Sequence, residues 1–213
     1  MKSGMRDWTA GLALAMAVLG AGCLGKSEEQ HLAAGQQHLA KDDVPAAIIE
    51  FKNALSRNAD SGEARLQLGQ ALLRSGDASG AVLELRKAGA LGVAAERVEP
   101  VLARAMLRSG DHAGVVSKFS GQSLQSPEAF ADLLTSVAAA HVELGELGKA
   151  RASAQAAVEV APTFAPAVVA LARMRAADGE NDEALRMLDD LRSSAREDEP
   201  AGVLRGEIQW RGK

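Results

Sequence analysis

Apolar and small residues recur along the chain at steps of three and four, the spacing that places side chains on one face of an α-helix. The sets come in pairs, and short polar stretches rich in Gly and Asp separate the two members of a pair. Examples of such sets are Ala47, Phe51 and Ala54, then Ala81, Leu85 and Ala88, then Ala150, Ala154 and Ala157. The pattern predicts an all-α chain of amphipathic helices that are joined two by two through tight turns.

The predicted turns recur at a nearly fixed interval. They fall at Asp42-Asp43, Gly76-Asp77, Gly110-Asp111, Gly145-Glu146 and Gly179-Glu180. Glycine at the first place supplies the left-handed backbone that ends a helix, and a carboxylate at the second can accept backbone N–H groups of the next helix. The phrase LRSGD, which occurs at 73–77 and 107–111, contains this turn twice.

A helix-turn-helix unit that repeats every ~34 residues resembles the tetratricopeptide repeat. In that family the eighth, twentieth and twenty-seventh places are small, because the helices approach closely there. This chain has Gly35, Ala47, Ala54; Gly69, Ala81, Ala88; Ala138, Ala150, Ala157; and Ala172, Ala184 before Leu191. The expected fold class is therefore all-α, a right-handed tetratricopeptide superhelix (an α-solenoid of helix-turn-helix repeats).

The period divides residues 31–198 into about five units, which we place at 28–61, 62–95, 96–129, 131–164 and 165–198. The third unit is irregular, because its second helix runs after Phe119 into the Ser- and Gln-rich stretch SGQSLQSPEA. We expect a shortened helix, a loop and one inserted residue, Phe130. This irregularity is either a binding feature or a tolerated defect of the array. Residues 199–213, including Trp210, are expected to form a partial sixth repeat or a capping helix.

The first residues are typical of a secretory signal. Lys2 and Arg6 precede a short apolar run that ends at Cys23 and is followed by polar residues. We expect a signal peptide at 1–22 and a polar tether at 23–30. LGAGC also resembles a bacterial lipobox, although Gly20 stands where that pattern has Leu. The resemblance implies that Cys23 is lipidated; an uncleaved anchor and an ordinary signal are the alternatives.

The residue after the cysteine bears on where such a lipoprotein would be placed. Leu24 is not the Asp that usually retains bacterial lipoproteins at the inner membrane. The lipobox resemblance therefore implies the bacterial envelope, facing the periplasm, at the outer membrane.

Two longer stretches are similar to a narrower family, the tetratricopeptide lipoproteins of the exosortase/PEP-CTERM system. These are AKDDVPAAIIEFKNALSRNADSGEARLQLGQALLRSGDASGAVLELRKA and VEPVLARAMLRSGDHAGVVSKF, followed by SPEAFADL. Among those proteins this chain would be a short or truncated member. The resemblance implies a lipid-anchored, non-catalytic scaffold associated with exopolysaccharide production and protein sorting. A general lipoprotein for pilus or outer-membrane assembly, or an uncleaved membrane-anchored adaptor, is the alternative.

Partners are expected on the concave face, which the first helices of the units line. The fifth, ninth, twelfth and thirteenth places combine an apolar floor with amide and guanidinium donors, which suits an extended peptide or an amphipathic helix. The candidate groove residues are Gln36, Leu39, Leu66, Gln70, Leu73, Arg74, Arg104, Leu107, Arg108 and Arg173. The alternative is that these side chains form an ordinary solvated helix face.

Composition and motifs argue against other classes of function. The 24 basic and 28 acidic residues give a net charge of -4, which offers no electrostatic case for nucleic acid. His31 and His38 share a helix face but lack a third ligand at fixed spacing, so packing is favoured over a metal pair. Neither a phosphate loop nor a G-x-S-x-G elbow occurs. We therefore expect no enzyme, no cofactor and no metal, but protein or peptide partners and a lipid anchor at Cys23.

Overall fold

The structure is a computed structural model that describes residues 26–193 and 199–211. Eleven α-helices, and no strand, occur in these two ranges. The helices are α1 (Glu28–Ala40), α2 (Val44–Arg57), α3 (Gly62–Ser75), α4 (Ala78–Ala90), α5 (Ala95–Arg108), α6 (His112–Phe119), α7 (Pro127–Glu143), α8 (Leu147–Val160), α9 (Ala165–Ala177), α10 (Asn181–Ser193) and α11 (Glu199–Arg211). The expected all-α class is confirmed.

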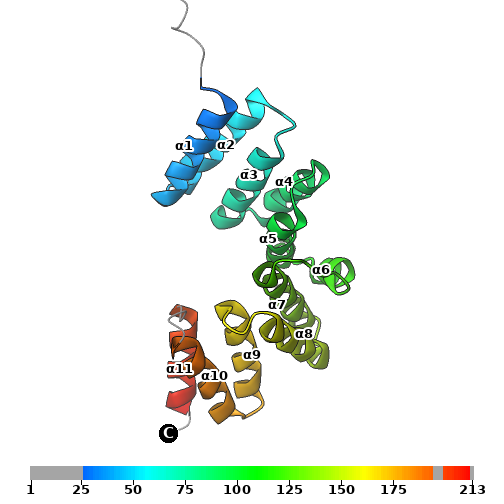
Figure 1. Ribbon diagram of the computed structural model, residues 1–213, viewed down its shortest axis with the longest axis vertical. Helices are drawn as coiled ribbons and strands as arrows, with labels where there is room; N and C mark the ends of the chain where they lie inside the picture. The colour runs from blue at the N-terminus through cyan, green and yellow to red at the C-terminus, as the bar shows by residue number, and fades with distance from the viewer. Residues whose placement is uncertain (1–25, 194–198, 212–213) are drawn as a thin grey trace, which may run out of the picture.

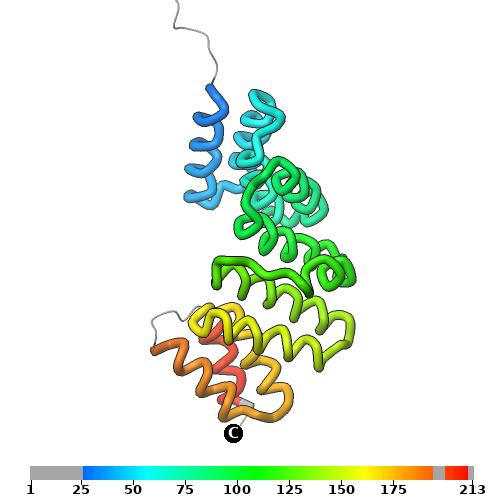
Figure 2. The backbone as a smooth tube through the Cα atoms, turned by 45° about the vertical axis from the view of Figure 1, so that its right-hand side comes forward, coloured from blue at the N-terminus to red at the C-terminus, as the bar shows by residue number. Residues whose placement is uncertain are grey.

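The helices stack as successive pairs into a curved array (Figures 1 and 2). Within each pair the two helices pack against each other, and successive pairs pack on one another along the chain up to α11. In Figure 1 α3, α5 and α7 lie on the inner side of the curve, whereas α4, α6 and α8 lie on its outer side. This is the architecture of an α-solenoid, as the period predicts.

The turns within the pairs have the predicted backbone. Gly76, Gly110, Gly145 and Gly179 have φ values of 92°, 84°, 74° and 86°, and Asp42 takes the equivalent place with a φ of 59°. This left-handed conformation is nearly free of strain for glycine and is tolerated by Asp better than by most residues. The glycine and aspartate at this place therefore end the first helix of each pair.

The acidic residue after each turn caps the next helix in the first three repeats. The carboxylate oxygens of Asp43, Asp77 and Asp111 accept the backbone N–H three residues later, at 3.2, 2.8 and 3.0 Å. Each bond satisfies an N–H group that would otherwise lack a partner at the helix start. The predicted role of the aspartates is confirmed.

The small residues allow the two helices of a pair to approach closely. A Cβ atom at Gly35 would lie 2.4 Å from the Phe51 ring, and one at Gly69 would lie 2.7 Å from Leu85 Cγ. Phe51 and Leu85 are fully buried, so neither can move aside at low cost. The eighth place must therefore stay empty of a side chain in the first two repeats.

The third repeat departs from its neighbours. Its second helix, α6, has 8 residues, and the shortened helix and the loop after it are confirmed. The expected position of Phe130 is wrong, because α7 starts at Pro127 and incorporates Phe130 in a helix of 17 residues. Ser126 begins this helix by accepting the N–H of Ala129 at 3.3 Å. The expected boundary between the units at 129 and 131 therefore falls inside α7.

The two ends of the array differ from the expected boundaries. Ser27 caps α1 by accepting the N–H of Gln30, so residues 28–30 are helical and do not belong to a tether. At the other end Ala201, Leu204 and Ile208 of α11 pack into the apolar cluster that α9 and α10 form. Trp210 does not take part, because 80% of it is exposed.

The expected signal and the lipidation site lie outside the described residues, since both fall in 1–25. Among the helices of the described ranges, none is long and apolar enough to cross a membrane.

Candidate functional site

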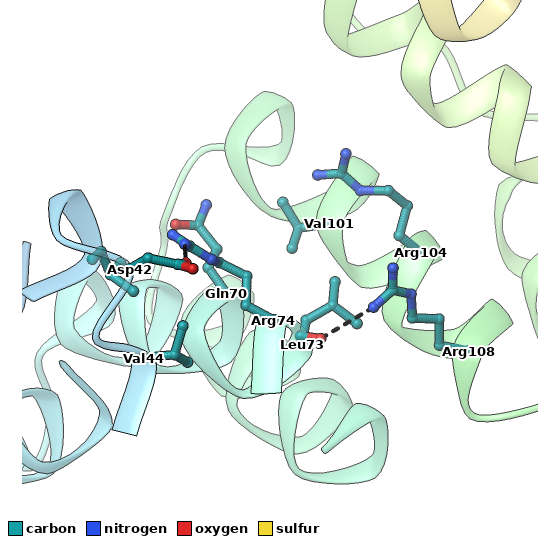
Figure 3. A pocket seen from close by; sticks show the side chains of 9 residues that line it. Asp42, Val44, Gln70, Leu73, Arg74, Val101, Arg104 and Arg108 are labelled. Atoms are coloured by element: carbon teal, nitrogen blue, oxygen red, sulfur yellow. Dashed lines mark hydrogen bonds and ion pairs between the residues drawn. The ribbon is translucent and has the colours of Figure 1, made fainter. Parts of the chain in front are cut away.

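A hollow of about 690 Å³ lies on the concave side, between the α1–α2 turn, α3 and α5 (Figure 3). Nine residues line it: Leu39, Asp42, Val44, Gln70, Leu73, Arg74, Val101, Arg104 and Arg108. Six of them are among the ten groove residues that the sequence suggests. We call this hollow the arginine groove.

The repeat explains why three arginines meet in the groove. Arg104 and Arg108 stand four places apart on α5 and therefore share one face of that helix. Arg74 stands on α3 at the place that Arg108 occupies on α5, one repeat later. Neighbouring repeats present equivalent places to the same side, and Figure 3 shows Arg74 with Gln70 on one wall and the two arginines of α5 on the other.

Each arginine is held by one contact within the chain. Arg74 Nη2 donates to Asp42 Oδ1 at 2.7 Å, and Arg108 Nη1 donates to the Leu73 carbonyl oxygen at 3.3 Å. Arg104 Nη1 lies 3.4 Å from Asp132 Oδ2 on α7. A guanidinium has five N–H donors, so these contacts orient the side chains and leave donors for a bound carboxylate.

Asp132 is a partly buried carboxyl group beside the groove. Burial raises the pKa of Asp132 above the ordinary value, while the positive charge of Arg104 acts in the opposite direction. Burial disfavours the charged carboxylate, and a nearby cation favours it. The ion pair between Arg104 and Asp132 therefore links α5 to α7 beside the groove.

A second hollow, of about 470 Å³, continues the concave face between α7 and α9. Its walls are mainly apolar and include Val142, Leu147, Val169 and Met174. Arg173 also lines it, at the repeat place that Arg104 takes in the arginine groove. Leu147 is 62% exposed, although a leucine side chain is more often buried. The concave face thus changes from cationic over α3 and α5 to apolar over α7 and α9.

Three of the suggested groove residues lie elsewhere. Leu66 is wrong as a contact residue, because it is 0% exposed and belongs to the main apolar core. Leu107 is half-buried and packs against that core, and Gln36 is exposed on α1 but lines neither hollow. In α3 the fifth place of the repeat faces the core and not the groove. Helical spacing alone does not distinguish these two adjacent faces of the helix.

The sequence interpretation missed three lining residues of the arginine groove, Asp42, Val44 and Val101. Asp42 and Val44 flank the first turn, which the period does identify. Their approach to α3 becomes visible only when successive repeats are stacked, because Asp42 and its partner Arg74 belong to different repeats.

Three of the four histidines contact single carboxylates, whereas the buried Nδ1 of His112 has no hydrogen-bond partner among the described residues. His31 is buried, and its Nδ1 lies 2.6 Å from Glu50 Oε2; His141 Nδ1 lies 2.6 Å from Glu146 Oε2. The pKa of Glu50 is lowered chiefly by its hydrogen bond with His31, and that of Glu146 chiefly by its hydrogen bond with Lys149. His38 is only half-buried and contacts Asp43 at 3.2 Å. In the part of the chain that the structure describes, no three potential metal ligands lie together.

Comparisons with known proteins place the fold among tetratricopeptide proteins. No model of a protein family and no curated relative matches the chain. A thermophilic TPR protein of Thermus thermophilus, TTC0263, is similar in structure with a TM-score of 0.69 at 24% identity, over 86% of this chain and 99% of that one. A structure of Pseudomonas aeruginosa pilF has a TM-score of 0.65 at 14% identity, over 78% of this chain and 75% of that one.

A third solved structure bears on binding. YrrB, a TPR protein with an unusual peptide-binding site, has a TM-score of 0.55 at 14% identity, over 83% of this chain and 91% of that one. At these identities the similarities show the fold alone. The chain has the tetratricopeptide α-solenoid fold, as its period predicts.

Proposed function

We propose that this chain is a non-catalytic scaffold or adaptor whose arginine groove binds an acidic segment of a partner polypeptide. The observation that carries the proposal is the meeting of Arg74, Arg104 and Arg108 around one hollow of about 690 Å³. The fold supports it, because TPR proteins that resemble this chain include one described as having a peptide-binding site.

The chemistry of the groove determines the kind of segment. Guanidinium groups bind carboxylates through paired, charge-assisted hydrogen bonds. Between the arginines, Leu39, Val44 and Val101 supply apolar walls. An extended peptide or an amphipathic helix with Asp or Glu side chains and interspersed apolar residues satisfies both features.

Charge reversal of two arginines tests the proposal. In the Arg74→Glu, Arg108→Glu protein we expect unchanged helicity and melting temperature, because both side chains are exposed. Capture of partners from bacterial envelope extracts is expected to fall at least about tenfold, since two favourable charge pairs become repulsive. The matched control is Lys52→Glu with Arg57→Glu, which makes the same charge change on exposed residues of α2 away from the groove. Equal capture by the groove variant and the wild-type protein contradicts the proposal.

The finer proposal is a lipid-anchored protein of the bacterial envelope, facing the periplasm at the outer membrane. Its support is the lipobox-like stretch that ends at Cys23. Palmitate should label the wild-type protein and not the Cys23→Ser protein. Label that persists in the variant contradicts lipidation at this residue. A wild-type protein without label also contradicts it and leaves an uncleaved anchor or an ordinary signal.

The client process we propose is exopolysaccharide production together with PEP-CTERM protein sorting, on the support of the sequence resemblance. Exosortase and polysaccharide genes beside the gene for this chain are the expected observation. Pilus or outer-membrane assembly genes in their place would overturn this assignment in favour of a general envelope-assembly role.

A further inference from the structure

The outer side of the array has a hollow where α6 stops. The second helices of the other four repeats have 13 or 14 residues, whereas α6 has 8. A hollow of about 460 Å³ lies between the last turns of α4 and the first turns of α5, with Lys118 of α6 at its edge. An α6 of ordinary length would run along this part of α5. We call the hollow the α6 cleft.

The other repeats show what occupies the equivalent place. At the twenty-seventh place the second helix carries a fully buried alanine in three repeats, at Ala54, Ala88 and Ala157, and the buried Leu191 in the fifth. In the third repeat this place is Gln122, which lies in the loop after α6. The α6 cleft therefore stands where sibling repeats hold a helical turn with a buried apolar residue, an alanine in three of the four.

The floor of the α6 cleft is apolar and has room for further atoms. Val93, Val98 and Leu102 contribute side chains from the α4–α5 turn and from α5. Gly89 on α4 also lines it, and a Cβ atom there would find its nearest neighbour, Val98 Cγ1, at 3.7 Å. That is ordinary van der Waals contact, so a small apolar group fits against this floor. Val98 and Leu102 are already buried, so filling the hollow would remove from water mainly the apolar surface of Val93, Ala90 and Ala95, which also line it.

The lining of the α6 cleft includes two cations from two different helices. Arg86 on α4 and Lys118 on α6 are both exposed, and within 26–193 and 199–211 neither forms an ion pair with an acidic side chain. Lys118 Nζ lies 5.1 Å from the centre of the Phe119 ring. The one acidic lining residue, Glu99, is within 2.7 Å of the side-chain amide nitrogen of Gln122, once that amide is oriented to donate. The lining therefore favours an occupant with carboxylates.

We propose that the α6 cleft is a second docking site, separate from the arginine groove, for an amphipathic helical segment of another polypeptide. Alanine-sized apolar residues of that segment face α4 and α5 in place of the missing turns of α6. Asp or Glu side chains on its flank pair with Arg86 and Lys118. The irregular third repeat is thus a binding feature.

A designed peptide tests the proposal on the full chain. The probe has about 14 residues, the length at which a helix in water becomes marginally stable, with Ala and Leu on one face and Glu on both flanks. Fluorescence anisotropy should show saturable binding of this probe. The same peptide with Lys for Glu should bind at least about tenfold more weakly, because it meets like charges.

Two variants locate the binding. Gly89→Leu fills the floor of the cleft at a helical position where Leu is a better helix former than Gly, so the chain should fold and lose the Glu probe. Arg86→Glu with Lys118→Glu should reverse the preference, so that the Lys probe binds more tightly than the Glu probe.

Nuclear magnetic resonance locates the binding on the wild-type protein. Amide resonances of Val93 and Val98 should shift when the Glu probe is added, and those of Gln70 and Arg104 should not.

The result is independent of the proposed function. Arg74→Glu with Arg108→Glu should leave binding of the Glu probe unchanged. Loss of partner capture by the arginine groove and loss of probe binding by the α6 cleft can therefore be observed separately. No saturable binding, equal binding of the Glu and Lys probes, or binding that survives in the Gly89→Leu protein would overturn the proposal. A dimer that grows with concentration and that Gly89→Leu disperses would make a second copy the occupant, which also overturns it.

Discussion

The second and third repeats contain the same phrase, LRSGD, and build the same turn from it. Gly76 and Gly110 take φ values of 92° and 84°, and the aspartate that follows each of them caps the next helix. Arg74 and Arg108 stand at equivalent places and both reach the arginine groove. The two copies therefore build the same turn and place an arginine at the same groove, although Arg74 pairs with Asp42 and Arg108 donates to the Leu73 carbonyl oxygen.

The helices that follow these turns differ. α4 has 13 residues and α6 has 8. After Leu85 the α4 sequence continues with three good helix formers, Arg86, Lys87 and Ala88, whereas Ser120 and Gly121 follow Phe119 directly and favour an end. The comparison teaches that the phrase determines the turn, while residues beyond it determine how far the next helix extends and whether a cleft remains.

The largest expected effect is at the end of the short helix. Phe119→Ala should lower the free energy of unfolding by about 3–5 kcal/mol, because a fully buried aromatic ring leaves a cavity. Leu85→Ala, at the same place in the second repeat, should cost about 2–5 kcal/mol. Urea denaturation gives both values, and hydrogen exchange should show that α6 alone loses protection locally in the Phe119 variant. A cost below about 1 kcal/mol at Phe119 would show that α6 is not held by this side chain.

The next effect concerns the close approach of helices in the second repeat. Gly69→Ala should destabilise by about 1–3 kcal/mol, the usual cost of overpacking. The added Cβ would lie 2.7 Å from Cγ of the buried Leu85. Gly148→Ala is the control, because no atom lies close to a Cβ there; we expect it to stabilise by about 0.5–1 kcal/mol. Thermal or urea unfolding measures both, and equal effects of the two variants would contradict close packing at Gly69.

Removing the helix caps should have a smaller effect that differs between the repeats. Asp77→Ala and Asp111→Ala should each cost about 1 kcal/mol, the usual value for an N-cap. Because α6 is so short, we expect loss of its cap to raise amide exchange throughout α6, whereas α4 should fray only at its start. Hydrogen exchange of the two variants checks this, and uniform exchange changes in both helices would remove the distinction.

The smallest effect is an acid-sensitive contact between the two repeats. Arg97 Nη1 of α5 lies 2.8 Å from Glu63 Oε2 of α3, and the hydrogen bond from Arg97 lowers the pKa of Glu63. Because the pKa of Glu63 is lower in the folded state than in the unfolded state, the ion pair stabilises the fold above the unfolded-state pKa, near 4.5. This stabilisation is lost as the pH falls through the lower folded-state pKa. The pair is partly exposed, so its contribution should be about a few tenths of a kcal/mol.

Glu63→Gln tests this pH dependence. The stability difference between wild type and variant should be present at about pH 6 and vanish at about pH 3. Urea denaturation at both pH values measures it. A difference that grows on acidification would contradict the assigned direction.

Local features of the fold follow from the sequence because local physics determines them. The period, the left-handed glycines and the small residues at Gly35 and Gly69 each reflect a contact within one helix pair. The placement of Leu66 in the core does not follow from such a local contact. The core and groove faces of α3 are separated by only a fraction of a helical turn, and the angle at which successive repeats stack decides which face Leu66 lies on. The α6 cleft likewise depends on how three helices from two repeats meet.

The candidate site shows the same division. Arg74 and Arg108 are recognisable as groove residues from the period alone, since equivalent places face one side. Their surroundings could not be predicted, because Asp42 reaches Arg74, and Asp132 reaches Arg104, from neighbouring repeats at distances that depend on the curvature of the array.

The central claim is that the concave arginines are the surface where a partner binds, and an exchange footprint of the captured complex tests it most directly. We predict protection from hydrogen exchange in α3 and α5 around Gln70, Arg74 and Arg108, which the Arg74→Glu, Arg108→Glu protein does not show. Protection confined to the outer helices α2, α4 and α8, with the concave helices unchanged, would contradict it.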